Sequence, residues 1–272
     1  MDRADSGSEG PCHCHVHPSG DYLFVAHYTG GAVSVLPVRD DGSLGSPTDV
    51  VQHQGSSEHP ERQTQAHPHS ITSGPNGRFL YVPDLGTNAI AVYELDARRG
   101  TLGQTTIINV PSGRGPRHLE FHPSGQYIYV TNELDSTLTA FERNPETGAL
   151  VERGTEPTAP TSFEGDNFPA DVHVYPSGEW VFCSNRGNDS VAAFEIDAET
   201  GGVTRRSHES TRGEWPRSFA IDATGELLIV GNRATDEIVT LRFDGRTGRL
   251  DATGDTADVH NPACMQFHPA DG

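Results

Sequence analysis

A unit of about 50 residues recurs along the chain, and it constrains the fold more than any other feature of the sequence. Each copy begins at a proline, runs through a short apolar segment to a turn containing glycine, and enters a second apolar segment that often ends in Asn. Five copies follow this pattern, and a sixth is represented by its first segment alone. The copies begin at Pro11, Pro68, Pro116, Pro169, Pro216 and Pro262. A recurrence of this length indicates repeated supersecondary units.

Within each copy, the apolar segments and turns predict four short strands. A turn such as Pro123–Gly125 joins the first two strands as a hairpin, a third apolar segment follows, and a glycine turn leads to a short fourth strand. Four strands per unit are typical of the blades of a β-propeller. A β-sandwich, the alternative all-β fold, does not explain why one unit recurs. We therefore predict a single all-β propeller domain over residues 1–272, with surface loops at 46–66 and 154–168.

The charge balance limits the partners of the chain. It carries 38 Asp and Glu residues against 19 basic residues, all of them Arg, for a net charge of -19. Nucleic acid is not expected as a partner, because the phosphate backbone requires basic patches. An acidic, lysine-free surface favours a salt-rich cytoplasm, as in a halophile, where salt screens the self-repulsion. A GC-rich genome would favour the same residues.

Three further features favour the cytoplasm. No apolar run reaches the length of a membrane span, so we expect no membrane association. The N-terminus lacks the basic and apolar regions of a secretory signal. The four cysteines are irregularly spaced and do not suggest a disulfide framework.

Two columns of the repeat are expected to meet on one rim of the propeller. The first strand of each blade lines the central channel, and the second strand runs antiparallel to it. The residue after each opening proline therefore lies beside the end of the second strand. These columns and their neighbours supply His67, His69, Arg117, His118, Asn132, Glu133, Asp171, His173, Asn185, Arg186, Arg217 and Arg233.

The chemistry of these columns suits an anionic substrate. Arginine binds a carboxylate or phosphate in bidentate fashion, and a histidine or glutamate beside it can act as general acid or base. The residues predicted to be catalytic are His69, Arg117, Glu133 and Arg186. Substrate contacts are predicted for His67, His118, Asn132, Asn185 and Arg217.

Each of these residue types also has a structural interpretation. Asn at the end of a strand commonly satisfies backbone groups in a turn, and Asp84 fits the same role. An arginine at a strand end, as at Arg217 or Arg233, is commonly a solvated charge or an ion-pair partner. His118 and His173 can be half-buried strand residues with satisfied hydrogen bonds, which is the interpretation we favour for His173.

The segment Cys12–His17 alternates cysteine and histidine and invites a metal interpretation. On a strand, the two cysteines face one way and the three histidines the other. A closed site needs four ligands at the right geometry, and the segment is also the first strand of its repeat with polar substitutions. We expect neither a metal nor a cofactor.

Short motifs at the repeat columns resemble the lactonase-type seven-bladed propeller family, which includes bacterial 6-phosphogluconolactonases and fungal carboxy-cis,cis-muconate cyclases. The motifs run nearly from end to end of the chain: His67-Pro68-His69-Ser70, Gly115-Pro116-Arg117-His118, Asn132-Glu133-Leu134, Asn185-Arg186-Gly187 and Pro216-Arg217-Ser218. The resemblance implies a site at the channel mouth that uses His69 (or His67), Arg117, Glu133 and Arg186. It also implies chemistry that requires no metal.

The resemblance implies hydrolysis of a sugar-acid lactone, most closely that of a 6-phosphogluconolactonase. Arg117 and Arg186 would bind the anionic substrate and polarise its carbonyl, while His69 or Glu133 would activate water. The alternatives are the lactone-forming direction of a muconate cyclase and a non-catalytic binding scaffold. Members of the family are longer, so we expect five blades and the first strand of a sixth, without the family's N-terminal blade.

Overall fold

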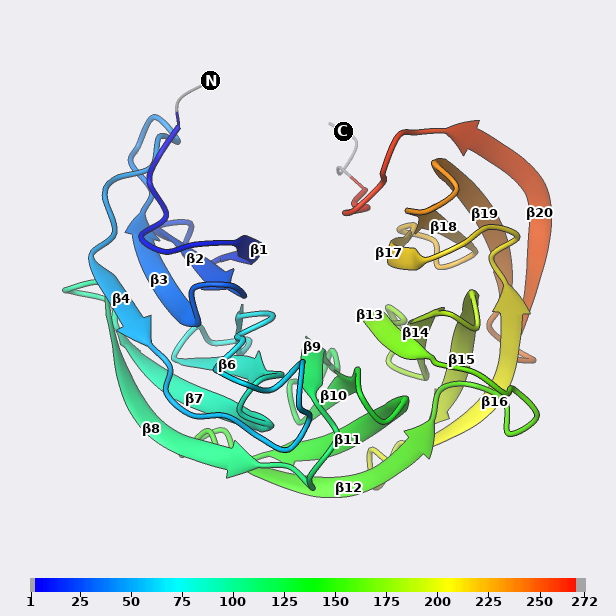
Figure 1. Cartoon of the computed structure of the whole chain (residues 1–272), viewed down its shortest axis with the longest axis horizontal. Coiled ribbons are helices and arrows are strands. Elements are labelled where there is room, and N and C mark those ends of the chain that lie inside the picture. The colour runs from blue at the N-terminus through cyan, green and yellow to red at the C-terminus, as the bar shows by residue number, and fades with distance from the viewer. Residues whose placement is uncertain (1–2, 268–272) are drawn as a thin grey trace. The chain divides into compact units, whose positions relative to one another are not determined.

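A computed structural model describes residues 3–267, and all regular structure in this range is β-sheet. The described residues form twenty strands in five four-stranded sheets, and they contain no helix (Figure 1). In every sheet, strands that are consecutive in the chain are hydrogen-bonded neighbours. This up-and-down arrangement is that of propeller blades, and it confirms the predicted β-propeller fold.

Tertiary contacts divide the chain into two compact units. Unit 1 comprises the residues up to Leu119 together with Arg143–Val151, and unit 2 comprises Glu120–Glu142 together with the residues from Glu152 onward. The division falls within the third sheet. The single domain expected from the repeat stays a prediction.

Unit 1 contains the first two sheets. Their strands are β1 (Pro11–Val16), β2 (Tyr22–His27), β3 (Ala32–Pro37), β4 (Asp49–Gln52), β5 (Thr72–Ser73), β6 (Phe79–Asp84), β7 (Ala89–Asp96) and β8 (Thr101–Asn109). The middle strands read as near-continuous apolar runs because both of their faces are covered. Phe24 and Val35 of the first sheet share a buried cluster with Leu80 and Tyr93 of the second.

The inner strand of the second sheet is shorter than the repeat predicts. Only Thr72 and Ser73 form a ladder, while Pro68 makes an isolated bridge to Asp84. Between these points the His69 N–H still donates to the Pro83 carbonyl of β6 at 2.9 Å, whereas the Ile71 N–H donates to Nδ1 of His13 at 3.3 Å. A polar side chain of β1 thus replaces part of the expected ladder.

Unit 2 contains the last two sheets, and the third sheet spans the division. The strands are β9 (Pro116–Phe121), β10 (Tyr127–Asn132), β11 (Thr137–Arg143), β12 (Leu150–Pro157), β13 (Phe168–Val174), β14 (Trp180–Arg186), β15 (Ser190–Ile196), β16 (Val203–Ser210), β17 (Pro216–Ile221), β18 (Leu227–Asn232), β19 (Glu237–Asp244) and β20 (Arg249–Asp258). Strand β13 lies beside β17, and β16 lies beside β20 (Figure 1). Phe182, Phe219 and Phe243 belong to the apolar cluster between these two blades.

Residues 46–66 and 154–168, which are expected to be surface loops, contain strand residues and buried side chains. Strand β4 occupies part of 46–66, and Gln63 is fully buried, with Nε2 donating to the Leu85 carbonyl at 2.8 Å. Strand β12 enters 154–168, where Thr158 and Asn167 are buried. These side chains satisfy backbone and amide groups at neighbouring strand ends, a role that leaves no periodic pattern in a sequence.

The opening of the sixth copy does not form the expected strand. Residues 262–267 have no strand assignment, and the next residue lies outside the described part of the chain. A strand requires a ladder partner, and no strand among the described residues pairs with this segment.

Candidate active site

The register of the inner strand pairs brings the two predicted columns together. In the first, second, fourth and fifth sheets, the opening of the first strand lies opposite the end of the second: Pro11 opposite His27, Pro68 opposite Asp84, Pro169 opposite Asn185 and Pro216 opposite Asn232. The register then shifts just after the proline in the first, fourth and fifth sheets. Because such a bulge re-aims side chains, residues in the first column leave the regular in-and-out alternation.

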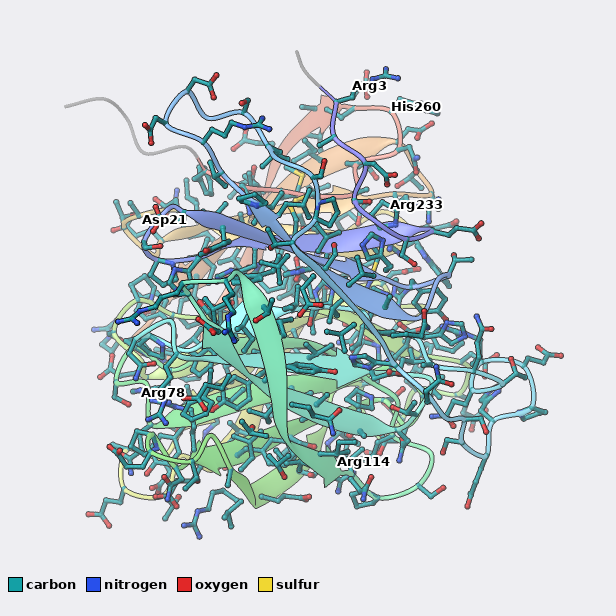
Figure 2. The ribbon with its side chains drawn as sticks, turned by 90° about the vertical axis from the view of Figure 1, so that its left-hand side faces the viewer. Arg3, Asp21, Arg78, Arg114, Arg233 and His260 are labelled. Carbon is teal, nitrogen blue, oxygen red and sulfur yellow. The ribbon has the colours of Figure 1, made fainter. Side chains whose placement is uncertain are left out.

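On unit 1, the loops that enter the inner strands lie away from the hairpin turns. Figure 2 shows Asp21 and Arg78, in the turns of the first two blades, on one side, and Arg114, in the loop before β9, on the other. The candidate residues that follow Pro68 and Pro116 therefore belong to the Arg114 side.

His67 is held in a defined orientation by Tyr28 and Asp84. Its backbone N–H donates to Oδ1 of Asp84 at 2.8 Å, and its ring lies stacked 4.2 Å from Tyr28. Nδ1 lies 2.7 Å from the Tyr28 carbonyl oxygen. A carbonyl only accepts, so Nδ1 carries the proton and Nε2 is the basic nitrogen.

The other candidates of unit 1 gather in an imidazole cluster. The His69 ring meets the His118 ring edge-on at 5.2 Å, and His118 in turn meets His13 at 5.4 Å. Arg117 is almost fully buried, and its backbone carbonyl accepts a hydrogen bond from the Ser70 hydroxyl at 3.0 Å. This bond ties the segment carrying His67 and His69 to β9.

In unit 2, Arg186 and Glu133 form a buried ion pair. Nη2 of Arg186 lies 2.8 Å from Oε2 of Glu133, and the two side chains are 6% and 2% exposed. Nε donates to the Phe168 carbonyl at 3.0 Å, and Nη2 also donates to the Pro169 carbonyl at 3.3 Å. The guanidinium lies 5.4 Å from the centre of the Trp215 ring. Its remaining nitrogen, Nη1, has no hydrogen-bond partner among the described residues.

Trp215 lies against the candidate site, which the sequence did not predict. Its φ is 63° and a proline follows directly. This backbone conformation is energetically unfavourable for a residue with a large side chain. Its N–H donates to Oδ1 of Asp189 at 2.9 Å, which holds the strained turn, and its ring contacts Phe168 as well as Arg186. The sequence offers one signal for this residue: the chain has only two tryptophans, and one of them stands directly before a repeat-opening proline.

Asn132 and Asn185 are enclosed by their own strand ends. Both are fully buried. The Asn132 amide donates to the hydroxyls of Thr137 and Thr139, each at 2.8 Å, and the Asn185 amide donates to the Thr158 carbonyl at 3.2 Å. These bonds support a positioning role at the strand ends, and the predicted contact with substrate stays a prediction.

A third group lies on the inner strands of unit 2. The His173 ring lies between two carboxylates, with Nε2 3.4 Å from Oδ2 of Asp171 and Nδ1 3.9 Å from Oε2 of Glu120. Desolvation by the surrounding strands disfavours its charged form, but the charges of Asp171 and Glu120 prevail and raise the pKa of His173 to about 9. Desolvation also raises the pKa of Glu120. The sequence favours a half-buried strand histidine with satisfied hydrogen bonds at this position. In the structure, the neighbours of its two ring nitrogens are carboxylates.

The remaining candidates are less enclosed. Arg217 is partly exposed in the bulge at the start of β17, and Arg233 is exposed, with Nε donating to Oδ1 of Asn261 at 2.6 Å. Histidines in and just after β1 contact the second blade: His15 bonds the Ser73 hydroxyl at 2.8 Å and His17 the Gly77 carbonyl at 3.1 Å. Among residues 3–267, no group of three or more His, Cys, Asp or Glu side chains is placed so that it could hold a metal ion. In the same range, no helix is long and apolar enough to cross a membrane.

Comparisons with known proteins agree with this architecture. A family model described as lactonase, 7-bladed β-propeller, matches residues 1–267. A 6-phosphogluconolactonase of Bacillus subtilis is 35% identical over 94% of this chain and 73% of its own length. The structure of a putative 6-phosphogluconolactonase from Bacteroides fragilis is 31% identical with a TM-score of 0.90, covering 98% of this chain and 76% of that one. A periplasmic gluconolactonase of Pseudomonas aeruginosa is 32% identical with a TM-score of 0.89, covering 96% and 73%. The repeat, the strand-end motifs and these matches agree, and the chain belongs to the lactonase family of seven-bladed β-propellers.

Proposed function

We propose that this protein hydrolyses the lactone of a sugar acid, as its 6-phosphogluconolactonase relatives are named for doing. The observation that carries the proposal is the buried pair of Arg186 and Glu133. Three contacts fix the guanidinium in place, and one corner of it, Nη1, remains available. A fixed cation of this kind is preorganised for an anionic group or a developing oxyanion.

The reaction adds water to the lactone carbonyl and breaks the ring C–O bond. Nη1 of Arg186 would bind the substrate's anionic group or the carbonyl oxygen, on which negative charge develops. A general base removes a proton from the attacking water, and the departing ring oxygen takes up a proton, so the product is the open hydroxy acid. Glu133 is our proposed base in unit 2, and His69 of unit 1 is the alternative.

Arg117 is proposed as a second anion-binding group, on the chemistry of its side chain and its place in the repeat. His67 and His118 are proposed to contact the substrate, since a ring nitrogen such as Nε2 of His67 can exchange a proton or a hydrogen bond with a sugar hydroxyl. Arg217 keeps its predicted role as a further contact.

We also propose that the protein acts in the cytoplasm of a salt-adapted cell. None of its four cysteines, all within the described residues, forms a disulfide, which fits a reducing compartment. A net charge of -19 without a single lysine fits high salt. If so, raising the salt concentration increases the free energy of unfolding, which a denaturation series in potassium chloride would measure. A decrease would contradict the salt adaptation.

The decisive variant is Glu133→Gln, which keeps the side chain's shape and removes its charge. We expect kcat/KM on a sugar-acid δ-lactone to fall by roughly 10²–10⁴-fold, the usual contribution of a general base. The matched control is Glu195→Gln, which breaks an exposed pair with Arg206 in the same unit and should leave the rate unchanged. A folded Glu133→Gln protein with the wild-type rate would overturn Glu133 as the base. If Arg186→Met and Arg117→Ala also hydrolyse at the wild-type rate, the whole proposal fails.

A further inference from the structure

A hollow on unit 1 lies away from the inner strands that carry the candidate active site. It encloses about 360 Å³ and is lined by residues 52–56 after β4, by Thr87, and by side chains of β7 and β8. Several lining residues, among them Gln54, Gln104 and Asn109, are exposed, so the hollow is open to solvent.

A chain of buried hydrogen bonds forms part of the wall. Oδ2 of Asp84 lies 2.7 Å from Nδ1 of His53, and Nε2 of His53 lies 2.8 Å from the Tyr93 hydroxyl. The His53 and Asp84 side chains are 6% and 1% exposed, and Tyr93 is 1% exposed. His53 and Tyr93 both line the hollow.

The direction of this chain follows from its acceptors. Oδ1 of Asp84 accepts the backbone N–H groups of His67 and Thr87, at 2.8 and 3.0 Å, so the carboxylate acts as an acceptor throughout. Nδ1 of His53 therefore donates to Asp84, and its Nε2 accepts from the Tyr93 hydroxyl. Burial and the charges of Asp84 and Asp49 raise the pKa of Tyr93, which keeps the phenol protonated. Its oxygen retains lone pairs that can accept a hydrogen bond from a molecule in the hollow.

The rest of the lining is uncharged, with apolar residues of β7 and β8 beside polar side chains. It contains no Asp, Glu or Arg, although the chain has 38 acidic and 19 basic residues. Its polar groups are the amides of Gln54, Gln104 and Asn109 and the hydroxyls of Ser56 and Thr87. Amides and hydroxyls both donate and accept hydrogen bonds, as sugar hydroxyls do. An anion would find no arginine here and would meet a strongly acidic protein.

We propose that this hollow binds a neutral polyhydroxylated molecule, a free sugar or polyol. Asp84 ties the hollow to the candidate active site, because the same carboxylate holds His53 at the hollow and the backbone of His67. The wall is preorganised: Nε2 of the lining residue Gln52 donates to the carbonyls of Gly30 and Gly31, at 3.0 and 2.8 Å. The binding site itself does not depend on the proposed lactonase activity.

The test is isothermal titration of the intact chain with D-glucose and with sorbitol. We expect saturable binding that becomes about three- to tenfold weaker in Gln104→Ala, as for the loss of one neutral hydrogen bond. Gln104 is exposed, so this variant should fold normally, and Tyr93→Phe should weaken binding similarly. Gln126→Ala, at an exposed glutamine of unit 2 outside the hollow, is the matched control and should bind as the wild type does.

Two results would overturn the site. One is the absence of saturable binding of either probe. The other is sugar binding that is equally tight in the wild type and in Gln104→Ala. If Arg186→Met then abolishes this binding, the sugar occupies the candidate active site instead of the hollow. Because these titrations need no turnover, their failure is distinguishable from failure of the lactonase proposal, which is measured by hydrolysis.

Discussion

Asp84 at the end of β6 and Asn185 near the end of β14 occupy the same place in the repeat, and of the two only Asp84 is of an acidic type. Each strand carries, at its last or last-but-one position, a short polar residue that lies opposite the opening of its inner strand: Asp84 in the second sheet and Asn185 in the fourth. Gly86 and Gly187 follow at the same distance. A Cβ on Gly86 would lie 1.9 Å from the Gln65 carbonyl oxygen, and one on Gly187 would lie 2.1 Å from the Asp166 carbonyl oxygen.

This difference separates what the fold requires from what the site adds. Both ends need a side chain that bonds the preceding loop: Asp84 accepts the His67 N–H, and Asn185 bonds Asn167 and Thr158. The amide of Asn185 does this without a charge. The carboxylate of Asp84 is therefore not required by the blade, and its additional partner is His53.

The largest effect is expected for Asn185→Asp, which introduces in the fourth sheet the carboxylate that the second sheet carries at Asp84. The new carboxylate would face the Thr158 carbonyl in a fully buried place where the present hydrogen-bond partners of residue 185 are all uncharged. We expect the free energy of unfolding at neutral pH to fall by about 3–5 kcal/mol, the cost of an uncompensated buried charge. The loss should shrink as the pH is lowered and the carboxyl is protonated. Denaturant unfolding at two pH values measures both, and a wild-type stability at neutral pH would show that this end tolerates a charge.

The two glycines test what the ends share. Gly86→Ala and Gly187→Ala each force a methyl group against a backbone carbonyl, and Gly187 also has a φ of 103°. We expect each to cost about 3 kcal/mol, the upper part of the range for overpacking. Gly154→Ala is the control, since a Cβ there meets nothing within 4 Å. Equal denaturation midpoints for all three variants would contradict the close approach of loop and turn.

Removing the charge from its own blade should have a smaller effect. Asp84→Asn keeps the shape and the bonds to backbone N–H groups but weakens the bond to His53. We expect a loss of about 1.5 kcal/mol, the lower part of the range for hydrogen bonds to charged groups. Thermal unfolding against the wild type measures it. A larger loss than in Asn185→Asp would mean that the carboxylate is a requirement of the blade after all.

How much was predictable follows from the same strand ends. The repeat predicted the strand pairing and placed Arg186 and Glu133 as catalytic candidates, because a recurring pattern fixes register. It did not predict that Gln63 and Asn167, in segments expected to be surface loops, would be buried, nor that Trp215 would lie over Arg186. These contacts depend on how irregular segments fold back onto strand ends, and each occurs once, so no repeated pattern reveals it.

The smallest expected effect extends the comparison to the inner strands beside β6 and β14. Next to β6 the candidate histidine His69 meets another imidazole, whereas on β13 His173 lies between two carboxylates that raise its pKa to about 9. A raised pKa means that the folded state binds the proton more tightly, so this stabilisation is complete below pH 6.5 and is lost as the pH rises toward 9. Because the ring is one-third exposed, we expect a change below about 1 kcal/mol. Denaturant unfolding across this pH range should show a decline in the free energy of unfolding of the wild type and a flatter profile in His173→Gln. Parallel profiles would mean that the two carboxylates do not hold the proton on His173.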